Sequence, residues 1–163
     1  RHVVMGGAQI ARMGNQNLSL IGDHAKPARQ LLGTRAAATN TVNHTTSYWI
    51  ARHSPRTFVE SVDFVTGVGN DRARAAGPAA SRFHRLHRVV TNLGVFDFSG
   101  PDGGMALLSA HPGVSFAELQ AATGPPLHTA ETVPATRLPD ERELQLIREV
   151  LDPRKRREDE VPA

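Results

Sequence analysis

The sequence of 163 residues contains no cysteine. This absence excludes disulfide bonds, a thiolate nucleophile, and zinc or iron–sulfur centres held by cysteine. It also fits a reducing compartment, and we expect a cytoplasmic protein. Long hydrophobic runs are absent too, since no stretch approaches the roughly eighteen consecutive apolar residues that a membrane span requires. We therefore expect no association with a membrane.

Aromatic residues and excess charge are both scarce. Aromatics make up 5% of the chain and the formal net charge is +3. The basic residues 154–157 are followed at once by the acidic residues 158–160, which neutralise them locally. Nucleic-acid-binding proteins usually present a basic face with aromatic platforms, so no nucleic-acid partner is expected. We predict one domain over residues 1–152 and a charged tail over residues 153–163.

Short β-like runs separated by glycine-rich and asparagine-rich loops dominate the chain. The predicted strands lie at residues 3–5 (a buried strand), 18–21, 47–50 and 57–60, with β character continuing over 62–67, and then at 88–91, 94–98 and 105–109. Residues 71–81 are rich in alanine, glycine and arginine, and they predict an exposed, mobile loop.

Two helices have clear N-terminal signals. Ser115 with Glu118, and Asp140 with Glu143, each form the spacing of a capping box. In the second helix Leu144, Ile147, Val150 and Leu151 fall on one face. Because strands outnumber helices, the pattern predicts an α/β fold, with an open twisted sheet and flanking helices.

Most standard catalytic arrangements are missing from the sequence. There is no Gly-x-Ser-x-Gly motif to expose a serine nucleophile. His84 and His87 have a spacing that would suit a metal on one helical face. Their neighbours Arg82, Arg85 and Arg88 oppose a divalent cation, so we expect a structural or phosphate-facing role and no metal site.

Two polar loops are better candidates for ligand binding. The first contains Gln9, Asn15 and Asn17, and the second covers residues 33–46. Backbone amides exposed beside asparagine, threonine and arginine suit an oxyanion or a phosphate-bearing ligand. The alternative is that glycine and asparagine serve only as turn formers, and the residues alone leave both interpretations open.

Several blocks, in order, resemble the beta subunits of the family I coenzyme A transferases. They are residues 6–10 (GGAQI), 14–17 (GNQN), 58–66 (FVESVDFVT), 88–98 (RVVTNLGVFDF), 107–114 (LLSAHPGV) and 122–124 (ATG). The resemblance extends from residue 3 to about residue 152. It implies a CoA-transferase-like domain that lacks its N-terminal portion, an acyl-CoA substrate, and a separate alpha subunit as partner.

Within this family, residues 29–30, 33–35 and 40–49 (NTVNHTTSYW) look most like the hydrolase branch, whose members cleave a ring of cholesterol-derived CoA thioesters in actinobacteria. Transferases are expected to have a Gly-x-Gly-Gly turn at Gly33. Here residues 35–37 (RAA) replace its second half, which argues against CoA transfer. The resemblance to the hydrolase branch implies hydrolysis of a ring carbon–carbon bond: water adds at a ring carbonyl and the bond opens to give a further carboxylate.

In neither branch does the catalytic glutamate fall within this chain, so we assign it no catalytic residue. The expected substrate contacts are Gln9, Asn15, Asn17, Gly33, Thr34, Arg35, Asn40 and His44. No cofactor is expected, since CoA enters as part of the thioester substrate. Arg35 suits a substrate carboxylate or a CoA phosphate, but it equally suits a salt bridge at a subunit contact. His44 also fits a structural role.

Three hypotheses follow for the function. The first is the beta subunit of a heteromeric, ring-cleaving acyl-CoA hydrolase of steroid catabolism. The second is the beta subunit of a CoA-transferase that moves CoA between carboxylates. The third is a non-catalytic scaffolding subunit or fragment.

Overall fold

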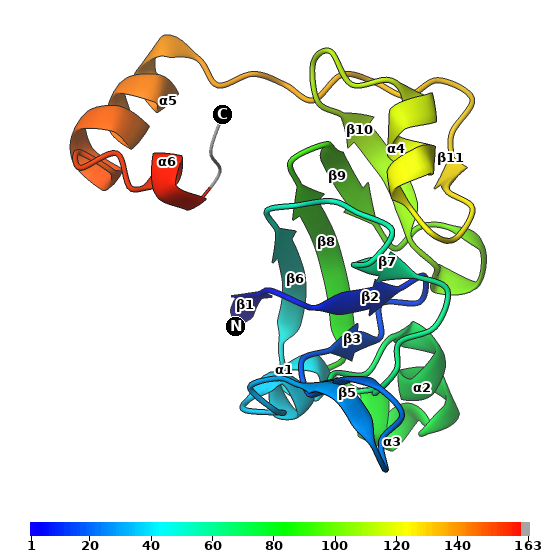
Figure 1. Cartoon of the computed structure of the whole chain (residues 1–163). Coiled ribbons are helices and arrows are strands. Elements are labelled where there is room, and N and C mark those ends of the chain that lie inside the picture. The colour runs from blue at the N-terminus through cyan, green and yellow to red at the C-terminus, as the bar shows by residue number, and fades with distance from the viewer. Residues whose placement is uncertain (161–163) are drawn as a thin grey trace.

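The computed structural model describes residues 1–160 and contains a central sheet of six strands (Figure 1). In spatial order the strands are β1 (His2–Met5), β6 (Thr45–Ile50), β8 (Arg85–Thr91), β9 (Gly94–Asp97), β10 (Ala106–Ala110) and β11 (His128–Thr129). The pairs β1–β6, β6–β8 and β10–β11 are parallel, whereas β8–β9 and β9–β10 are antiparallel. The sheet is therefore open and mixed, with β1 at one edge.

Two smaller sheets lie against the central one. The first consists of β2 (Gln9–Ala11), β3 (Gln16–Asn17) and β7 (Phe58–Val59), and the second is the hairpin of β4 (Leu20–Gly22) and β5 (Pro27–Gln30). Figure 1 shows β2, β3 and β7 in front of the middle of the sheet, near β8. The apolar core that these layers share includes Ile10, Tyr48, Phe58, Phe96 and Leu119, each fully buried.

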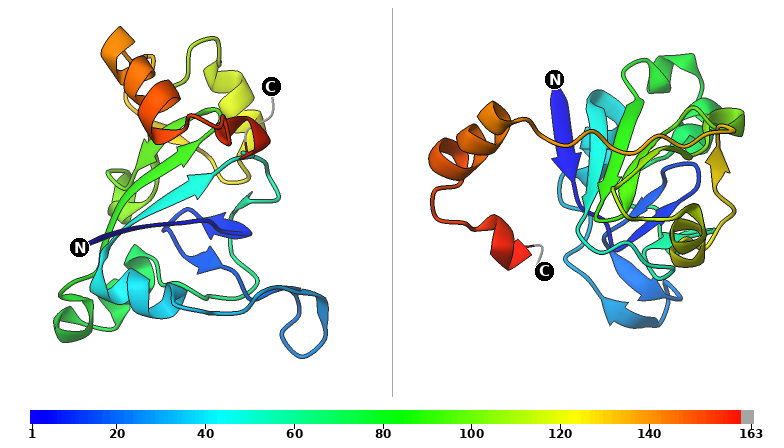
Figure 2. Two further views of the ribbon diagram at one scale, coloured as in Figure 1. Left: turned by 90° about the vertical axis from the view of Figure 1, so that its left-hand side faces the viewer. Right: turned by 90° about the horizontal axis from the view of Figure 1, so that it is seen from above.

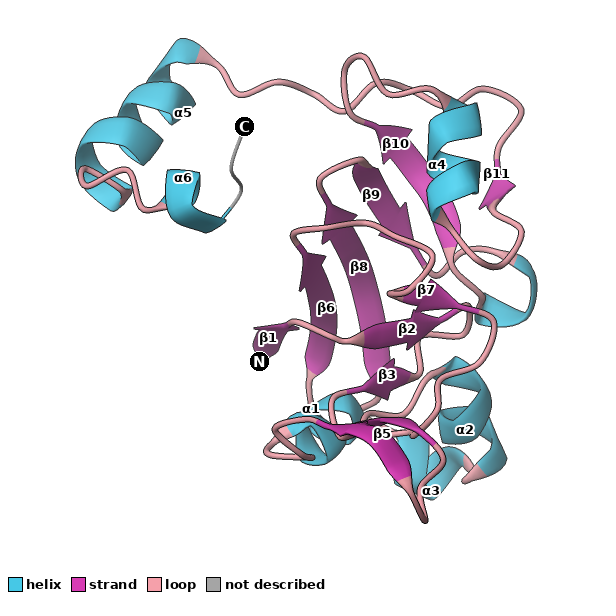
Figure 3. Ribbon diagram, in the orientation of Figure 1, coloured by secondary structure: helices cyan, strands magenta, loops and turns pink. Residues whose placement is uncertain are grey.

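Helices occupy both ends of the central sheet (Figure 3). The helices α1 (Ala37–Asn43), α2 (Asn70–Ala75) and α3 (Pro78–Ser81) lie at one end, and α4 (Phe116–Ala122) packs beside β10 and β11. A short 3-10 helix, η1 (Pro101–Gly103), precedes β10. This arrangement confirms the predicted α/β class with a central sheet and flanking helices.

The last described segment projects away from the sheet (Figure 2). It consists of α5 (Glu141–Gln145), the π-helical η2 (Leu146–Leu151) and α6 (Arg157–Glu160). Leu144 of the predicted apolar face is half-buried, whereas Ile147, Val150 and Leu151 are between 37% and 69% exposed. The described residues therefore leave most of this face uncovered. None of the helices within residues 1–160 is long and apolar enough to cross a membrane.

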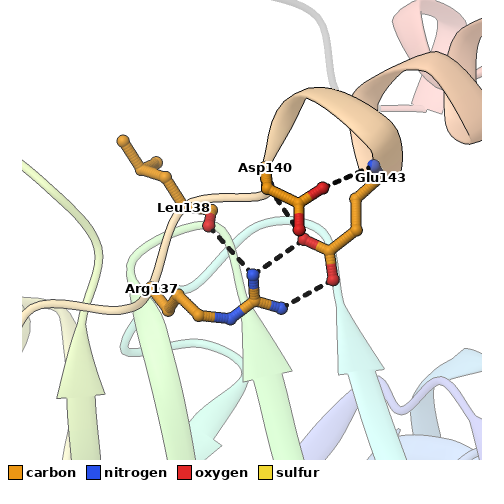
Figure 4. Close-up of polar contacts among 4 residues, drawn as sticks. All are labelled: Arg137, Leu138, Asp140 and Glu143. Carbon is orange, nitrogen blue, oxygen red and sulfur yellow. Dashed lines mark hydrogen bonds and ion pairs between the residues drawn. The ribbon is translucent and has the colours of Figure 1, made fainter.

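Both predicted capping boxes are present. Glu118 N donates to Ser115 Oγ at 3.3 Å, and Ser115 N donates to Glu118 Oε2 at 2.8 Å. Figure 4 shows the second box, where Glu143 N donates to Asp140 Oδ1 at 2.8 Å. Arg137 also binds both carboxylate oxygens of Glu143, at 2.7 and 2.9 Å. The hydrogen bonds that Arg137 and Asp140 N donate to the Glu143 carboxylate, the latter at 2.9 Å, lower the pKa of Glu143 to about 2, with Arg137 as the larger cause.

Three predictions about the strands and loops were wrong or incomplete. The segment 3–5 forms β1, but it is an edge strand rather than a buried one, since Val4 is 65% exposed. Residues 62–66 form no strand, and beyond β7 this region adds only a bridge between Gln16 and Gly67. Residues 71–81 are not a loop, because they contain most of α2 and all of α3.

The predicted domain boundary at residue 152 stays a prediction. Within the predicted tail, residues 157–160 form α6, and Arg157 pairs with Asp152 at 2.8 Å. Residues 161–163 lie outside the described part of the chain.

Candidate functional site

The three amide residues of the first loop are buried, and each is hydrogen-bonded within the protein. Asn17 is fully buried; its Nδ2 donates to Gln9 Oε1 at 2.7 Å and to Leu20 O at 2.6 Å. Its Oδ1 accepts from the backbone of Ser19 at 3.0 Å and of Leu20 at 3.4 Å. Asn17 therefore uses both of its amide donors and accepts two hydrogen bonds within the fold.

Gln9 and Asn15 hold the same loop to distant segments through two carboxylates. Gln9 Nε2 donates to Asp63 Oδ2 at 3.1 Å, and Gln9 Oε1 accepts from Asp63 N at 3.0 Å. Asn15 Nδ2 donates to Asp71 Oδ1 at 2.9 Å, and Asn15 Oδ1 accepts from Gly69 N at 2.8 Å. Sequence reasoning did not identify Asp63 or Asp71 as partners, because each lies more than fifty residues from the side chain that it holds.

Residues 30–33, which we call the strap, lead into the second loop and are hydrogen-bonded to residues 18–19, which directly follow the first loop. Leu31 N donates to Ser19 O at 2.9 Å, and Gly33 N donates to Leu18 O at 3.1 Å. Gln30 Nε2 also donates to Ser19 O, at 3.2 Å. These bonds bring the ends of the two predicted loops side by side. At Gly33 the backbone has a φ of 85°, which glycine adopts without strain.

After Gly33 the chain turns outward and exposes polar side chains. Thr34 and Arg35 are exposed. Arg35 has a φ of 46°, a left-handed conformation that is unfavourable for a residue with a Cβ. Within residues 1–160 the Arg35 side chain makes no hydrogen bond or ion pair, so its five donors remain available to a ligand.

Asn40 and His44 lie further along, at the junction of α1 with β6. Asn40 Nδ2 contacts Met5 Sδ at 3.5 Å, which joins α1 to β1. His44 caps the C-terminus of α1 and is half-buried. Its Nδ1 is buried and has no hydrogen-bond partner among the described residues. The structure thus places Asn40 within α1 and His44 at its C-terminus, whereas Thr34 and Arg35 precede α1 in the exposed loop.

Two cavities adjoin these loops, and neither was predicted from the sequence. A polar cavity of about 170 Å³ is lined by residues that include Arg12, Asn15, Glu60, Asp71 and Arg72. An apolar cleft of about 410 Å³ lies beneath the strap and is lined by Ala8, Leu18, Gln30, Leu31 and Leu32. Of the lining residues, Leu32 directly precedes Gly33 and the exposed loop that carries Arg35.

A structural or phosphate-facing role was expected for His84, and the structure shows the structural one. Its Nδ1 lies 2.6 Å from Thr41 O and its Nε2 lies 3.0 Å from Asn70 Oδ1, so it links α1 to α2. His87 lies within β8 and His84 just before it, so the two are not on one helical face. No group of three or more potential metal ligands occurs within residues 1–160.

His53 is the buried titratable group that sequence reasoning missed. Its ring stacks on Phe58, with centroids 4.0 Å apart, and it contacts Thr91 Oγ1 at 3.1 Å and Thr123 Oγ1 at 2.9 Å. Because the Thr123 hydroxyl donates to Leu119 O, His53 Nε2 is the donor in its bond to Thr123. The Thr91 hydroxyl lies 3.1 Å from Nδ1 and also donates to Gly94 O at 3.2 Å. Burial lowers the pKa of His53 to about 4.

We expect this histidine to make the protein less stable in acid. Between its ordinary pKa of 6.5 and about 4, the unfolded chain binds a proton at His53 that the folded chain does not. The free energy of unfolding therefore falls as the pH falls through this range, by on the order of 2 kcal/mol after a discount for residual solvent contact. Urea unfolding at several pH values measures this slope. His53→Gln should flatten it, whereas the exposed His128→Gln should not, and equal slopes in all three proteins would contradict the prediction.

The comparisons with known proteins agree with this arrangement of strands and loops. Residues 2–122 match the model of the family described as coenzyme A transferase. The chain is 52% identical over 161 residues to the cholesterol ring-cleaving hydrolase IpdB subunit of Rhodococcus jostii, covering 99% of this chain and 63% of the relative. It is 48% identical to the subunit of the same name from Mycobacterium tuberculosis, with 99% and 64% covered.

A more distant relative is a 3-oxoadipate CoA-transferase subunit from Pseudomonas knackmussii, 30% identical, with 88% of this chain and 56% of the relative covered. Among solved structures, the crystal structure of Rhodococcus jostii IpdAB superposes with a TM-score of 0.94 at 52% identity, covering all of this chain and 65% of that one. Glutaconate coenzyme A-transferase from Acidaminococcus fermentans gives 0.82 at 28% identity, with 94% and 59% covered. The chain thus spans less than two thirds of the length of these relatives.

Proposed function

The chain belongs to the coenzyme A transferase family, and on this premise we propose that it is the beta-type subunit of a heteromeric acyl-CoA hydrolase. Its substrate is a steroid-derived CoA thioester, in which it helps to hydrolyse a ring carbon–carbon bond. The partner is a separate alpha subunit, which supplies the general base. The enzyme acts in the cytoplasm and needs no cofactor, because CoA arrives with the substrate.

The observation that carries this proposal is the conformation of Arg35. Transferases of the family are expected to have a glycine at this position of the turn. In this chain the backbone keeps a left-handed conformation, with a φ of 46°, but the residue is arginine. A left-handed arginine costs about 1 kcal/mol relative to glycine. Strain of this kind is typical of residues retained for their side chain, and here the side chain is an exposed guanidinium.

Arg35 and Thr34 form the part of the site that meets the substrate. A guanidinium binds a carboxylate or a phosphate through two parallel hydrogen bonds, which suits both the CoA phosphates and the carboxylate that ring opening creates. Gly33 sets the turn, Asn40 lies within α1, and His44 lies at its C-terminus. Gln9, Asn15 and Asn17 are buried, and the contact of these five polar side chains with substrate is part of this proposal.

The similarity to named hydrolase subunits supports this function, at 52% and 48% identity. CoA transfer is the second candidate, since two relatives at 30% and 28% identity are named as CoA-transferase subunits. The two differ in their chemistry. Transfer requires a free carboxylate acceptor and a covalent glutamyl-CoA intermediate, whereas hydrolysis requires only water.

The test uses the chain purified together with an alpha-type subunit. A fused-ring 3-oxoacyl-CoA is incubated in water labelled in its oxygen, with and without acetate. We expect the label to enter a new carboxylate while the CoA thioester stays intact, and no acetyl-CoA to form. Formation of acetyl-CoA would show a transferase instead. Inactivity of every pairing would favour the scaffolding hypothesis.

A further inference from the structure

The apolar cleft under the strap has the features of a binding surface rather than of a gap in packing. Its volume is about 410 Å³, and four of its five lining residues are apolar, with Gln30 as the exception. Leu32 is 82% exposed, more than any other large hydrophobic residue of the described chain. Single exposed leucines are common, but this one continues into Leu31 and Leu18, which are half-buried.

The exposure of Leu32 is fixed by the backbone on both sides of it. Leu31 N and Gly33 N donate to Ser19 O and Leu18 O, at 2.9 and 3.1 Å. Gln30 Nε2 adds a third bond to Ser19 O, at 3.2 Å. The strap therefore continues β5 along residues 18–19, which precede β4, and Leu32 cannot retreat into the core without breaking these bonds. A leucine held outward in this way is ready to contact an apolar ligand.

The cleft also has a cationic end. Gly33 is bonded to Leu18, and Arg35 follows only two residues later, a span of at most about 7 Å. Because Arg35 makes no hydrogen bond or ion pair within residues 1–160, its guanidinium is able to reach a negative group on a ligand that fills the cleft. An apolar pocket with one polar anchor is typical of sites that orient a largely hydrocarbon molecule.

We propose that this cleft binds the fused hydrocarbon rings of the substrate, that Leu32 determines the preference for rings over short chains, and that Arg35 binds a carboxylate at the ring end. This inference rests on the proposed function, from which it takes the substrate class. It adds Leu18, Leu31 and Leu32 to the site, none of which the sequence analysis selected.

The test compares Leu32→Ser with Leu32→Met and with a control, Leu138→Ser. Leu138 is 68% exposed and lies outside the cleft, so the control removes a similar side chain from a similar environment. In the complex with the alpha subunit, we expect Leu32→Ser to raise KM for a fused-ring acyl-CoA about tenfold, because it loses the burial of a leucine. Used as a competitor, a four-carbon straight-chain acyl-CoA should inhibit Leu32→Ser and the unaltered complex equally, and Leu32→Met should restore the KM for rings.

A binding measurement separates this inference from the proposed function. Decalin carboxylate, a fused-ring carboxylate, is titrated calorimetrically into the same complexes, and Leu32→Ser should weaken its binding about tenfold. If rings are hydrolysed but KM and binding are unchanged in Leu32→Ser, the inference is wrong while the function stands. If no ring is opened but binding still depends on Leu32, the function is wrong while the ring site stands. If Leu32→Ser, unlike the control, prevents association with the alpha subunit, the cleft is a subunit contact and the inference fails.

Discussion

Asn17→Ala is expected to lower the free energy of unfolding by about 3 kcal/mol. The substitution removes the donor to Leu20 O and the acceptor for the backbone amides of Ser19 and Leu20, all within a fully buried environment. Each backbone group left without a partner costs about 1 kcal/mol or more. Since small domains are stable by only about 5–15 kcal/mol, urea unfolding should show the loss clearly.

Asn43→Ala is the matched control. Asn43 is an exposed asparagine at the end of α1 with no side-chain hydrogen bond in the described part of the chain. Its replacement should change stability by less than about 0.5 kcal/mol. The opposite result would be informative: if Asn17→Ala keeps its stability but raises KM for the acyl-CoA, Asn17 binds substrate directly and is not only a support.

Features encoded by neighbouring residues could be predicted from the sequence. The strands β9 and β10 were expected from the apolar runs at 94–98 and 105–109, and the structure pairs them antiparallel from Asp97 with Ala106 onward. The capping boxes at Ser115 and Asp140 were equally clear. In both cases the signal and the structure that it produces lie within a few residues of each other.

Features decided by distant contacts could not be predicted in this way. Residues 62–66 have strand-like composition, but they do not pair with another strand. Instead Asp63 N donates to the Gln9 side chain, and the Asp63 carboxylate accepts from Gly22 N. The Cβ of any residue other than glycine at position 69 would lie 2.4 Å from Met13 O. This close approach, to a residue more than fifty positions away in the sequence, requires glycine at the N-cap of α2.

The candidate site shows the same limit. Asparagine and glycine serve equally well in a ligand-binding loop and in the support beneath one, so the sequence left both interpretations open. The structure separates the residues by burial: Gln9, Asn15 and Asn17 are at most 7% exposed, whereas Thr34 and Arg35 face outward. The apolar cleft was missed because Leu18 and Leu32 are brought together only by the strap.

Arg35 offers the sharpest test, because its side chain is expected to raise activity while its backbone conformation is expected to lower stability. Arg35→Gly and Arg35→Ala both remove the guanidinium, and each should lower kcat/KM for the fused-ring acyl-CoA about 100-fold, as expected for the loss of a two-point, charge-assisted hydrogen bond. Only the glycine variant relieves the left-handed strain at a φ of 46°. It should therefore be about 1 kcal/mol more stable to urea than the alanine variant.

The exposed Arg29 of β5 provides the control for charge alone. Arg29→Ala removes the same charge from the neighbouring strand and should change kcat/KM by no more than about twofold. If it matches the Arg35 variants, general attraction of the anionic CoA explains the loss, and Arg35 has no specific contact. If both Arg35 variants keep full activity while glycine still adds stability, the strain is real but serves another purpose. Only the combined result, activity lost in both and stability gained in one, assigns the strain at Arg35 to binding of the substrate.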